Sequence, residues 1–158
     1  MKLVTYLKNG HDQLALLIDG SLYDTDLLHP DLPISMAMFL NYWDDVLPLA
    51  LAVEQRVKDG LGRTIMSTPF DEVQILAPVP HPTSCRDGYA FRQHVAAARR
   101  NRHVEMIPEF DQFPIFYFTN HNSIQGPGDN YCMPDHFNKL DFELEASIVI
   151  NRAGRNIM

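Results

Sequence analysis

The start of the chain is restricted to short strands by two dipeptides, Asn9-Gly10 and Asp19-Gly20. Both are typical of two-residue turns, because Asn, Asp and Gly tolerate the positive φ angles that such turns require. The stretches beside them, KLVTYL and QLALLI, are mostly apolar and have the length of ordinary strands. We therefore predict strands over 2–7, 13–18 and 21–23, joined by tight turns.

The period of the apolar residues changes after the third strand. Ser35 is placed to cap a helix that begins near Met36. A second helical run covers about 47–58 and is expected to stop at Gly60. A pair of helices is therefore predicted after the strands.

A proline-rich passage, PVPHP at 78–82, follows a predicted strand over 71–77. Its three prolines stiffen the backbone and remove hydrogen-bond donors, so regular structure is not expected to continue through it. We place a domain boundary there. The expected fold is of the α+β class, with a small β-rich domain that also carries helices over 1–77 and a second domain over 78–158.

The second domain is expected to open with a helix. Ser84 and Asp87 fit the Ser-x-x-Asp pattern of a helix start, and GYAFRQHVAAARR follows. On that helix Asp87 and His94 would share a face, because seven residues make nearly two turns. Beyond it, FPIFYFTN at 113–120 predicts a buried strand and GPGD at 126–129 predicts a turn.

The clearest alternation lies in LDFELEASIVI, which predicts a strand over 141–150. Apolar residues fall on one side of this strand, and Glu143 and Glu145 are neighbours on the other. Two like charges on a shielded face are costly unless a cation or a proton relieves them. The alternative is an acidic face in contact with water, since charged residues are mostly exposed.

The charge of the chain limits its partners. A net charge of −7 over 158 residues argues against a nucleic-acid binder, which usually presents a basic face. We find no apolar run of the length of a secretory signal or a membrane span, so neither a nucleic-acid nor a membrane partner is expected. Cys85 and Cys132 are expected to be free thiols in a cytoplasmic protein.

Three motifs occur in order along the second domain: Asp-x-Tyr-x₄-His, Phe-Pro-x-Phe-Tyr and Asp-x-Glu-x-Glu. They stand within RDGYAFRQHVAAAR, FPIFYFTNHNSIQGPGD and LDFELEASIVINRAGRNI. In this order and spacing they resemble the fumarylacetoacetate hydrolase family, and the residues before them resemble the small leading domain of many bacterial members. The resemblance implies that 78–158 is the first part of the family's mixed β-sheet catalytic fold.

The resemblance implies a metal site. Its carboxylate ligands would be Asp87, Glu143 and Glu145, and its cation Mg²⁺ or Ca²⁺, with Mn²⁺ as a further candidate. The chemistry of the donors agrees, because hard cations prefer oxygen ligands and no thiolate belongs to the set.

The resemblance also implies that His94 is the base that activates water, and that Tyr89 and Tyr117 line the substrate pocket. Cleaving a carbon–carbon bond beside a carbonyl needs a sink for the electrons, which a cation chelated by the substrate supplies, while a histidine deprotonates water. The expected activity is hydrolysis of a small 2-oxo or 2,4-dioxo (acylpyruvate-like) acid in aromatic or carboxylic acid catabolism. Family isomerases and decarboxylases use the same metal site, so they remain alternatives.

Family members are longer than this chain, and they contribute a further metal-binding aspartate and a catalytic lysine from beyond the matched stretch. We therefore expect the chain to be the front portion of a longer, homodimeric enzyme. Alone, it is expected to bind metal weakly and to turn over substrate poorly. The alternative from another class is a non-catalytic assembly or dimerisation module.

Overall fold

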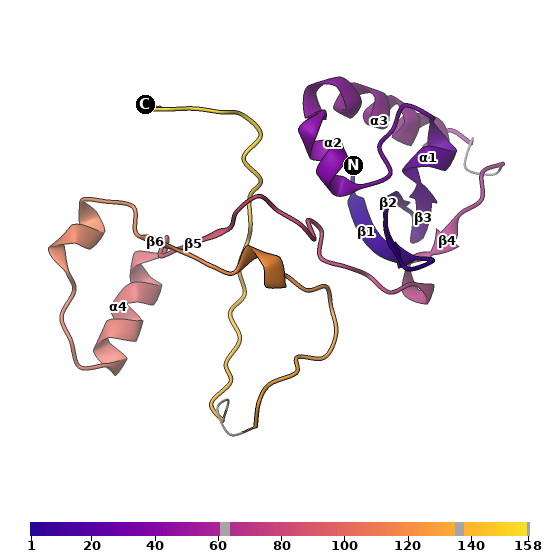
Figure 1. Cartoon of the computed structure of the whole chain (residues 1–158). Helices are drawn as coiled ribbons and strands as arrows, with labels where there is room; N and C mark the ends of the chain where they lie inside the picture. The colour runs from indigo at the N-terminus through magenta and orange to yellow at the C-terminus, as the bar shows by residue number, and fades with distance from the viewer. Residues whose placement is uncertain (61–63, 135–137, 158) are drawn as a thin grey trace. The chain divides into compact units, whose positions relative to one another are not determined.

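The computed structural model describes residues 1–60, 64–134 and 138–157 (Figure 1). None of the helices that it describes is both long and apolar enough to cross a membrane.

The chain divides into two compact units. The core unit comprises Met1–Pro80 and Gln125–Met158, and the α4 unit comprises His81–Ile124. Helices and antiparallel strands make the fold α+β, as predicted. The division into domains at residue 78 stays a prediction.

A four-stranded antiparallel sheet opens the core unit. Its strands lie in the order β1 Leu3–Lys8, β2 His11–Ile18, β3 Ser21–Asp24 and β4 Thr68–Pro69. The turn residues have φ angles of 51° and 82° at Asn9-Gly10 and of 49° and 80° at Asp19-Gly20. Positive φ at both central residues is the geometry of a type I′ hairpin. The three strands predicted at the start of the chain are confirmed.

Three helices follow β3 in the sequence: α1 Thr25–Leu28, α2 Met36–Asn41 and α3 Trp43–Lys58. The predicted cap of α2 is confirmed, because the Ser35 hydroxyl accepts a hydrogen bond of 3.4 Å from the backbone N–H of Met38. α3 starts earlier than predicted. It ends before Gly60, whose φ of 125° suits glycine and strains other residues.

β2 is buried on both faces. Leu14, Leu16 and Ile18 pack with the helices in the main hydrophobic cluster. Ala15 points to the other face, into a smaller cluster that includes Tyr6. This double burial accounts for the nearly continuous apolar run QLALLI, which lacks the polar alternation of a half-exposed strand.

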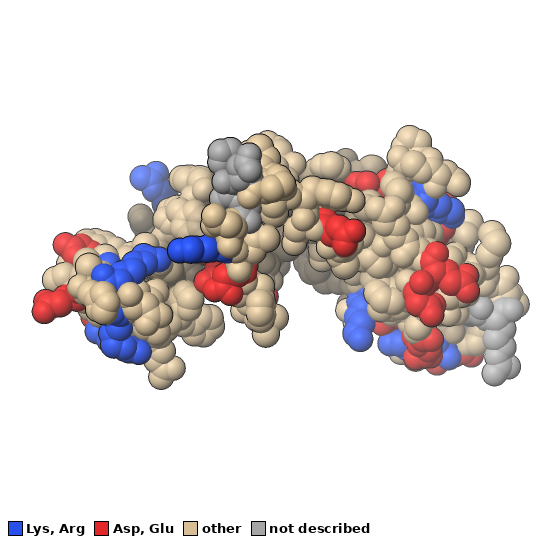
Figure 2. All heavy atoms as spheres, turned by 90° about the horizontal axis from the view of Figure 1, so that it is seen from below, with Lys and Arg blue, Asp and Glu red and all other residues tan. Residues whose placement is uncertain are grey.

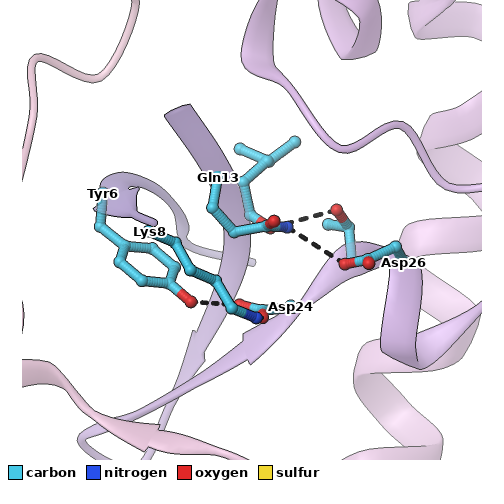
Figure 3. A network of polar contacts seen from close by, with 7 residues as sticks. Tyr6, Lys8, Gln13, Asp24 and Asp26 are labelled. Carbon is cyan, nitrogen blue, oxygen red and sulfur yellow. Dashed lines mark hydrogen bonds and ion pairs between the residues drawn. The ribbon is translucent and has the colours of Figure 1, made fainter. Parts of the chain in front are cut away.

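A polar network lies beside the smaller cluster (Figure 3). The buried Asp24 carboxylate accepts a hydrogen bond of 2.6 Å from the Tyr6 hydroxyl and forms an ion pair with Lys8. Burial, followed by the hydrogen bond to Asp24, raises the pKa of Tyr6. Gln13 and Asp26 continue the network at the surface, with 3.1 Å between their side-chain nitrogen and oxygen. The network ties β1 to the end of β3.

The predicted strand over 71–77 is wrong for most of its length. Phe70–Glu72 forms a 3₁₀ turn instead, and only Ile75 makes an isolated bridge to Tyr6 of β1. Two backbone hydrogen bonds of 2.9 Å flank that bridge. Pro78 has no N–H to donate, so pairing with β1 is confined to the few residues before it.

The α4 unit contains a two-stranded antiparallel sheet, one helix and two 3₁₀ turns: β5 Arg86–Gly88, α4 Arg92–Asn101, Pro108–Asp111, β6 Phe116–Phe118 and His121–Ser123.

The predicted helix start at Ser84–Asp87 is wrong. Arg86–Gly88 pairs with β6, and the helix begins only at Arg92. Gly88 disfavours a helix, and the cross-strand hydrogen bonds satisfy the backbone in its place. Asp87 and His94 therefore do not share a helix face.

The strand predicted over 113–120 is confirmed only over Phe116–Phe118, and its expected burial is wrong. The three side chains of β6 are between 52% and 69% exposed. β6 has β5 as its partner in the sheet, and its aromatic rings contact solvent on both faces.

The predicted strand over 141–150 is absent. Its residues are extended without a partner strand among the residues that the structure describes, and Phe142 and Leu144 are 86% and 96% exposed. An alternating sequence becomes a strand only when a second backbone supplies the ladder of hydrogen bonds. The alternating sequence is present over 141–150, but the described residues provide no strand that pairs with it.

Gly126 lies against the backbone of residues 75–76 within the core unit. A Cβ at this position would be 2.4 Å from the carbonyl oxygen of Ile75 and 2.7 Å from the carbonyl carbon of Leu76. No real side chain fits at such distances. The reversal predicted at 126–129 is present as a bend at 127–128.

Candidate active site

Asp87 and Tyr117 face each other across β5 and β6. They are register partners in the antiparallel pair, so their side chains leave the sheet on the same face. The Tyr117 hydroxyl donates a hydrogen bond of 2.5 Å to the Asp87 carboxylate. The pair is reached by solvent, with Asp87 half-buried and Tyr117 exposed. Two of the predicted site residues are therefore in direct contact.

Tyr89 and His94 form a second contact within the α4 unit. Their ring centroids lie 6.1 Å apart, and their planes meet at 63° in an edge-to-face arrangement. The backbone N–H of Tyr89 donates to the carbonyl of Ile115 at 3.0 Å, which continues the strand pairing one residue beyond β5. His94 lies in the first turn of α4. The sheet edge and the helix start thus hold these two rings together.

The opposite face of the β5–β6 sheet carries different side chains. The Arg86 guanidinium lies 4.4 Å from the ring centroid of Phe118 and 6.0 Å from that of Phe116. This cation–π contact covers one face of the sheet and leaves the other face to Asp87 and Tyr117. Alternation along two short strands therefore separates an aromatic face from a polar one.

An ion pair joins α4 to the 3₁₀ turn that follows it. Nε and one terminal nitrogen of Arg92 donate to the two oxygens of Asp111 at 2.9 and 3.1 Å. This hydrogen bonding lowers the pKa of Asp111 and raises the pKa of Arg92. The sequence reasoning missed this pair, because residues nineteen positions apart carry no periodic signal. It fixes the start of the helix that bears His94.

Glu143 and Glu145 lie in the core unit, in the segment over 138–157. Both side chains are exposed. The predicted meeting of these two carboxylates with Asp87 around one cation stays a prediction. Within either unit, the described residues contain no group of three Asp, Glu, His or Cys side chains placed to hold a metal ion.

The residues present nevertheless fit a divalent metal in their chemistry. The Asp87 carboxylate accepts one hydrogen bond, from Tyr117, through one of its two oxygens. A carboxylate has about four acceptor positions, so this bond is compatible with metal ligation. Three carboxylates without a thiolate form a donor set suited to Mg²⁺, Ca²⁺ or Mn²⁺.

The second part of the chain matches a known family. Residues 83–158 match the sequence model described as fumarylacetoacetate (FAA) hydrolase C-terminal. The match begins just before β5 and contains all six of the predicted site residues.

Curated relatives extend the similarity over the whole chain. The mitochondrial oxaloacetate tautomerase Fahd2a of Rattus norvegicus is 27% identical over 154 residues, which cover 96% of this chain and 44% of the relative. A fumarylacetoacetate hydrolase domain-containing protein 2 homolog of Dictyostelium discoideum is 25% identical, covering 99% of this chain and 48% of the relative. The mitochondrial oxaloacetate tautomerase FAHD2A of Bos taurus is 29% identical over 87% of this chain and 40% of the relative.

The chain spans about half the length of the curated relatives it matches. The motifs that suggested the family, the match over 83–158 and the relatives named for the same domain agree. Over residues 83–158 this chain is therefore similar to the fumarylacetoacetate hydrolase family.

Proposed function

We propose that the chain supplies the base, the pocket tyrosines and the carboxylate ligands of a metal-dependent enzyme that acts on small 2-oxo acids. The observation that carries this proposal is the pair of contacts in the α4 unit, from Asp87 to Tyr117 and from Tyr89 to His94. The four residues that the motifs single out form these two contacts from β5, the residue after it, β6 and the first turn of α4. Similarity to the family supports the same chemistry.

The leading reaction is the keto–enol conversion of a 2-oxo acid, because the rat and cattle relatives are named oxaloacetate tautomerases. This reaction breaks a C–H bond beside the carbonyl and forms an O–H bond, with no net change in composition. His94 would take the proton from carbon, since an imidazole accepts and returns protons near neutral pH. A bound divalent cation would supply the positive charge that favours the enolate form of the substrate.

The chain's own residues would position this chemistry. The edge-to-face contact with Tyr89 restrains the ring of His94. The hydrogen bond from Tyr117 restrains the Asp87 carboxylate in the same way. Restrained groups lose less entropy when substrate and metal bind, which is the advantage of preorganisation.

Hydrolysis of a carbon–carbon bond in a 2,4-dioxo acid is the second candidate, favoured by the description of the matched family. In that reaction His94 would remove a proton from water, the hydroxide would add to a carbonyl carbon, and the departing carbon would receive a proton. An acylpyruvate would then yield pyruvate and a carboxylic acid. Release of pyruvate from an acylpyruvate therefore distinguishes hydrolysis from tautomerisation.

Metal binding provides a direct test. Mn²⁺ titrated into the chain and followed by electron paramagnetic resonance should bind more weakly to Asp87→Asn and Glu143→Gln than to the unaltered chain. Glu109→Gln is the matched control, because Glu109 is exposed and lies outside the proposed ligand set. Equal Mn²⁺ affinity in all four proteins would contradict the proposed ligands.

Turnover provides the second test. His94→Asn should lower the Mg²⁺-dependent rate of oxaloacetate enol conversion by at least about a hundredfold, the usual contribution of a general base. His103→Asn makes the same chemical change on an exposed residue whose φ of 57° asparagine tolerates. A His94→Asn variant that retains the full rate would exclude this histidine as the base.

We further propose a homodimer as the active form and the cytoplasm as its location. The exposed apolar side chains of 140–150 support association, because contiguous apolar surface of this kind marks interaction sites. Analytical ultracentrifugation tests the dimer. Cell fractionation tests the location against the mitochondrial one in the names of the rat and cattle relatives.

A further inference from the structure

α4 carries a groove on its outer surface that the proposed reaction does not use. Its volume is about 360 Å³, and it is lined by Arg92, Gln93, Ala96 and Arg100. A volume of this size holds a small organic molecule. The small side chain of Ala96 leaves the space between the two arginines open.

The groove lies on a different side of α4 from His94. At about 100° per residue, the four lining residues fall within an arc of about 100°, because they are spaced at i, i+1, i+4 and i+8. By the same count His94 lies about 100° from Gln93 and about 120° from Arg100. Val95, the buried residue of the helix, lies on yet another side. A ligand in the groove is therefore separate from a substrate beside His94.

The two arginines of the groove differ in whether an acidic side chain balances their charge. Arg92 is held in place by its two hydrogen bonds to Asp111, which leave it further N–H groups that can donate to a ligand. Arg100 has no acidic side-chain partner among the residues that the structure describes. Because Asp111 balances the charge of Arg92, the groove keeps the positive charge of Arg100.

The surroundings of the groove are also the most basic part of an acidic chain. The α4 unit has five arginines against four acidic residues, whereas the whole chain has a net charge of −7. Figure 2 shows several blue side chains over the part of the surface that carries α4, on the left, with red acidic ones among them. A local excess of positive charge attracts anions.

We propose that this groove binds a small oxyanion, a carboxylate or a phosphate group, with Arg100 as its principal charge. Guanidinium groups recognise both anions through paired N–H donors. Gln93 and the restrained Arg92 would supply further donors around the same ligand. The site lies outside the proposed catalytic residues, so it offers a place where a metabolite can bind without competing with substrate.

The plainer role for Arg100 is to offset the negative end of the helix dipole, since it lies in the last turn of α4. Arg102, which follows the same helix end, fulfils that plainer role equally well and does not line the groove. The two residues therefore form a matched pair: neutralising either removes one positive charge from the same helix end, and only one change alters the groove.

The test is a titration of the ¹⁵N-labelled 158-residue chain with sodium phosphate and, separately, with sodium malonate, at an ionic strength held constant with sodium chloride. We expect saturable shifts of the Gln93 and Ala96 amides with at least one of the two anions. The tighter of the two identifies the ligand as phosphate-bearing or as an organic acid. Arg100→Gln should weaken binding by about fivefold, the upper range for an exposed charge pair.

Arg102→Gln should leave the affinity within about twofold of the unaltered chain, because Arg102 does not line the groove and salt weakens the attraction of its exposed charge for the ligand. Shifts that grow linearly with both anions, or an equal loss of affinity in Arg100→Gln and Arg102→Gln, would overturn the proposal. Amide spectra of both variants without ligand check that α4 keeps its fold. Because the readout is anion binding, its result is independent of whether His94 is the catalytic base.

Discussion

Residues 1–80 and the α4 unit differ most in how much side chain they bury. The first holds the hydrophobic clusters of the described chain, in which Leu14, Leu16 and Phe39 have no exposed surface. In the α4 unit Val95 is the one buried residue among those described. Four of the candidate site residues belong to this thinly packed unit. The comparison teaches that the stretch with the hydrophobic core and the stretch with most of the candidate site residues are different parts of the chain.

The contacts that hold the α4 unit are mostly polar and exposed, such as those from Arg92 to Asp111 and from Tyr117 to Asp87. Exposed pairs of this kind contribute little free energy. Segments with few buried apolar contacts open locally at low cost, and binding elements are often drawn from them. The α4 unit is therefore expected to exchange its amide hydrogens faster than residues 1–80, and ligands or partners that add contacts should slow this exchange.

The largest effect should come from the main cluster. Phe39→Ala should lower the free energy of unfolding by about 3–5 kcal/mol, because it removes a fully buried ring. Trp43, whose ring lies 5.9 Å from that of Phe39, reports the transition by fluorescence in urea. Val95→Ala should leave this transition in place and should affect only hydrogen exchange in α4. Equal shifts from both variants would remove the distinction between the two regions.

The next largest effect is expected at the buried carboxylate of the network in Figure 3. Asp24→Ala should cost about 2–3 kcal/mol, because Tyr6 and Lys8 each lose a hydrogen bond to a charged group. Asp26→Ala, which removes an exposed carboxylate bonded to Gln13, should cost less than about 1 kcal/mol. Denaturation curves that coincide for the two variants would show that the buried contacts of Asp24 stabilise the fold no more than the exposed contact of Asp26.

A smaller effect on stability should follow from adding a side chain at Gly126. Gly126→Ala places a methyl group on the backbone of residues 75–76, so one of the two segments must move. We expect a loss of about 1–2 kcal/mol, within the range for overpacking, because the atoms in the way belong to the backbone. Hydrogen exchange of the Leu76 amide should quicken, whereas Gln125→Ala should leave it unchanged. Slow exchange in both variants would show that the close approach is dispensable.

The smallest effect concerns the pH dependence of the helical part of the core unit. The hydrogen bond from Lys58, at 2.9 Å, lowers the pKa of Glu54. A carboxyl group whose pKa is lower in the folded state stabilises the fold above its unfolded pKa, and that contribution is lost as pH falls through the folded value. Glu54→Gln should therefore flatten the decline of the thermal midpoint on acidification. A decline as steep as in the unaltered chain would contradict this role.

Local turn chemistry made the first half of the fold predictable. Asn9-Gly10 and Asp19-Gly20 fixed the hairpins, and Ser35 fixed the start of α2, because each acts on its own neighbours in the chain. The prediction was wrong where distant segments decide. At Ser84–Asp87 the sequence has the pattern of a helix start, but Arg86–Gly88 pairs with β6 instead. In this pairing Asp87 and Tyr117 are thirty residues apart in the sequence.

The candidate site divides in the same way. The motifs pointed to Asp87, Tyr89, His94 and Tyr117, and the structure brings these residues into two contacts. The expected reason was wrong, because Asp87 approaches the site from a strand and not from the helix of His94. The ion pair of Arg92 with Asp111 had no sequence signal, since it depends on how the chain returns after α4.

The double burial of β2 has a consequence for how this protein tolerates change. Along the strand, three large aliphatic side chains and one alanine serve opposite layers, so the two layers are coupled through a single stretch of backbone. Inserting or deleting one residue there would send every side chain to the wrong layer at once. Insertions and deletions are therefore expected in the connections around this strand. A redesign must keep the number of residues in β2 itself.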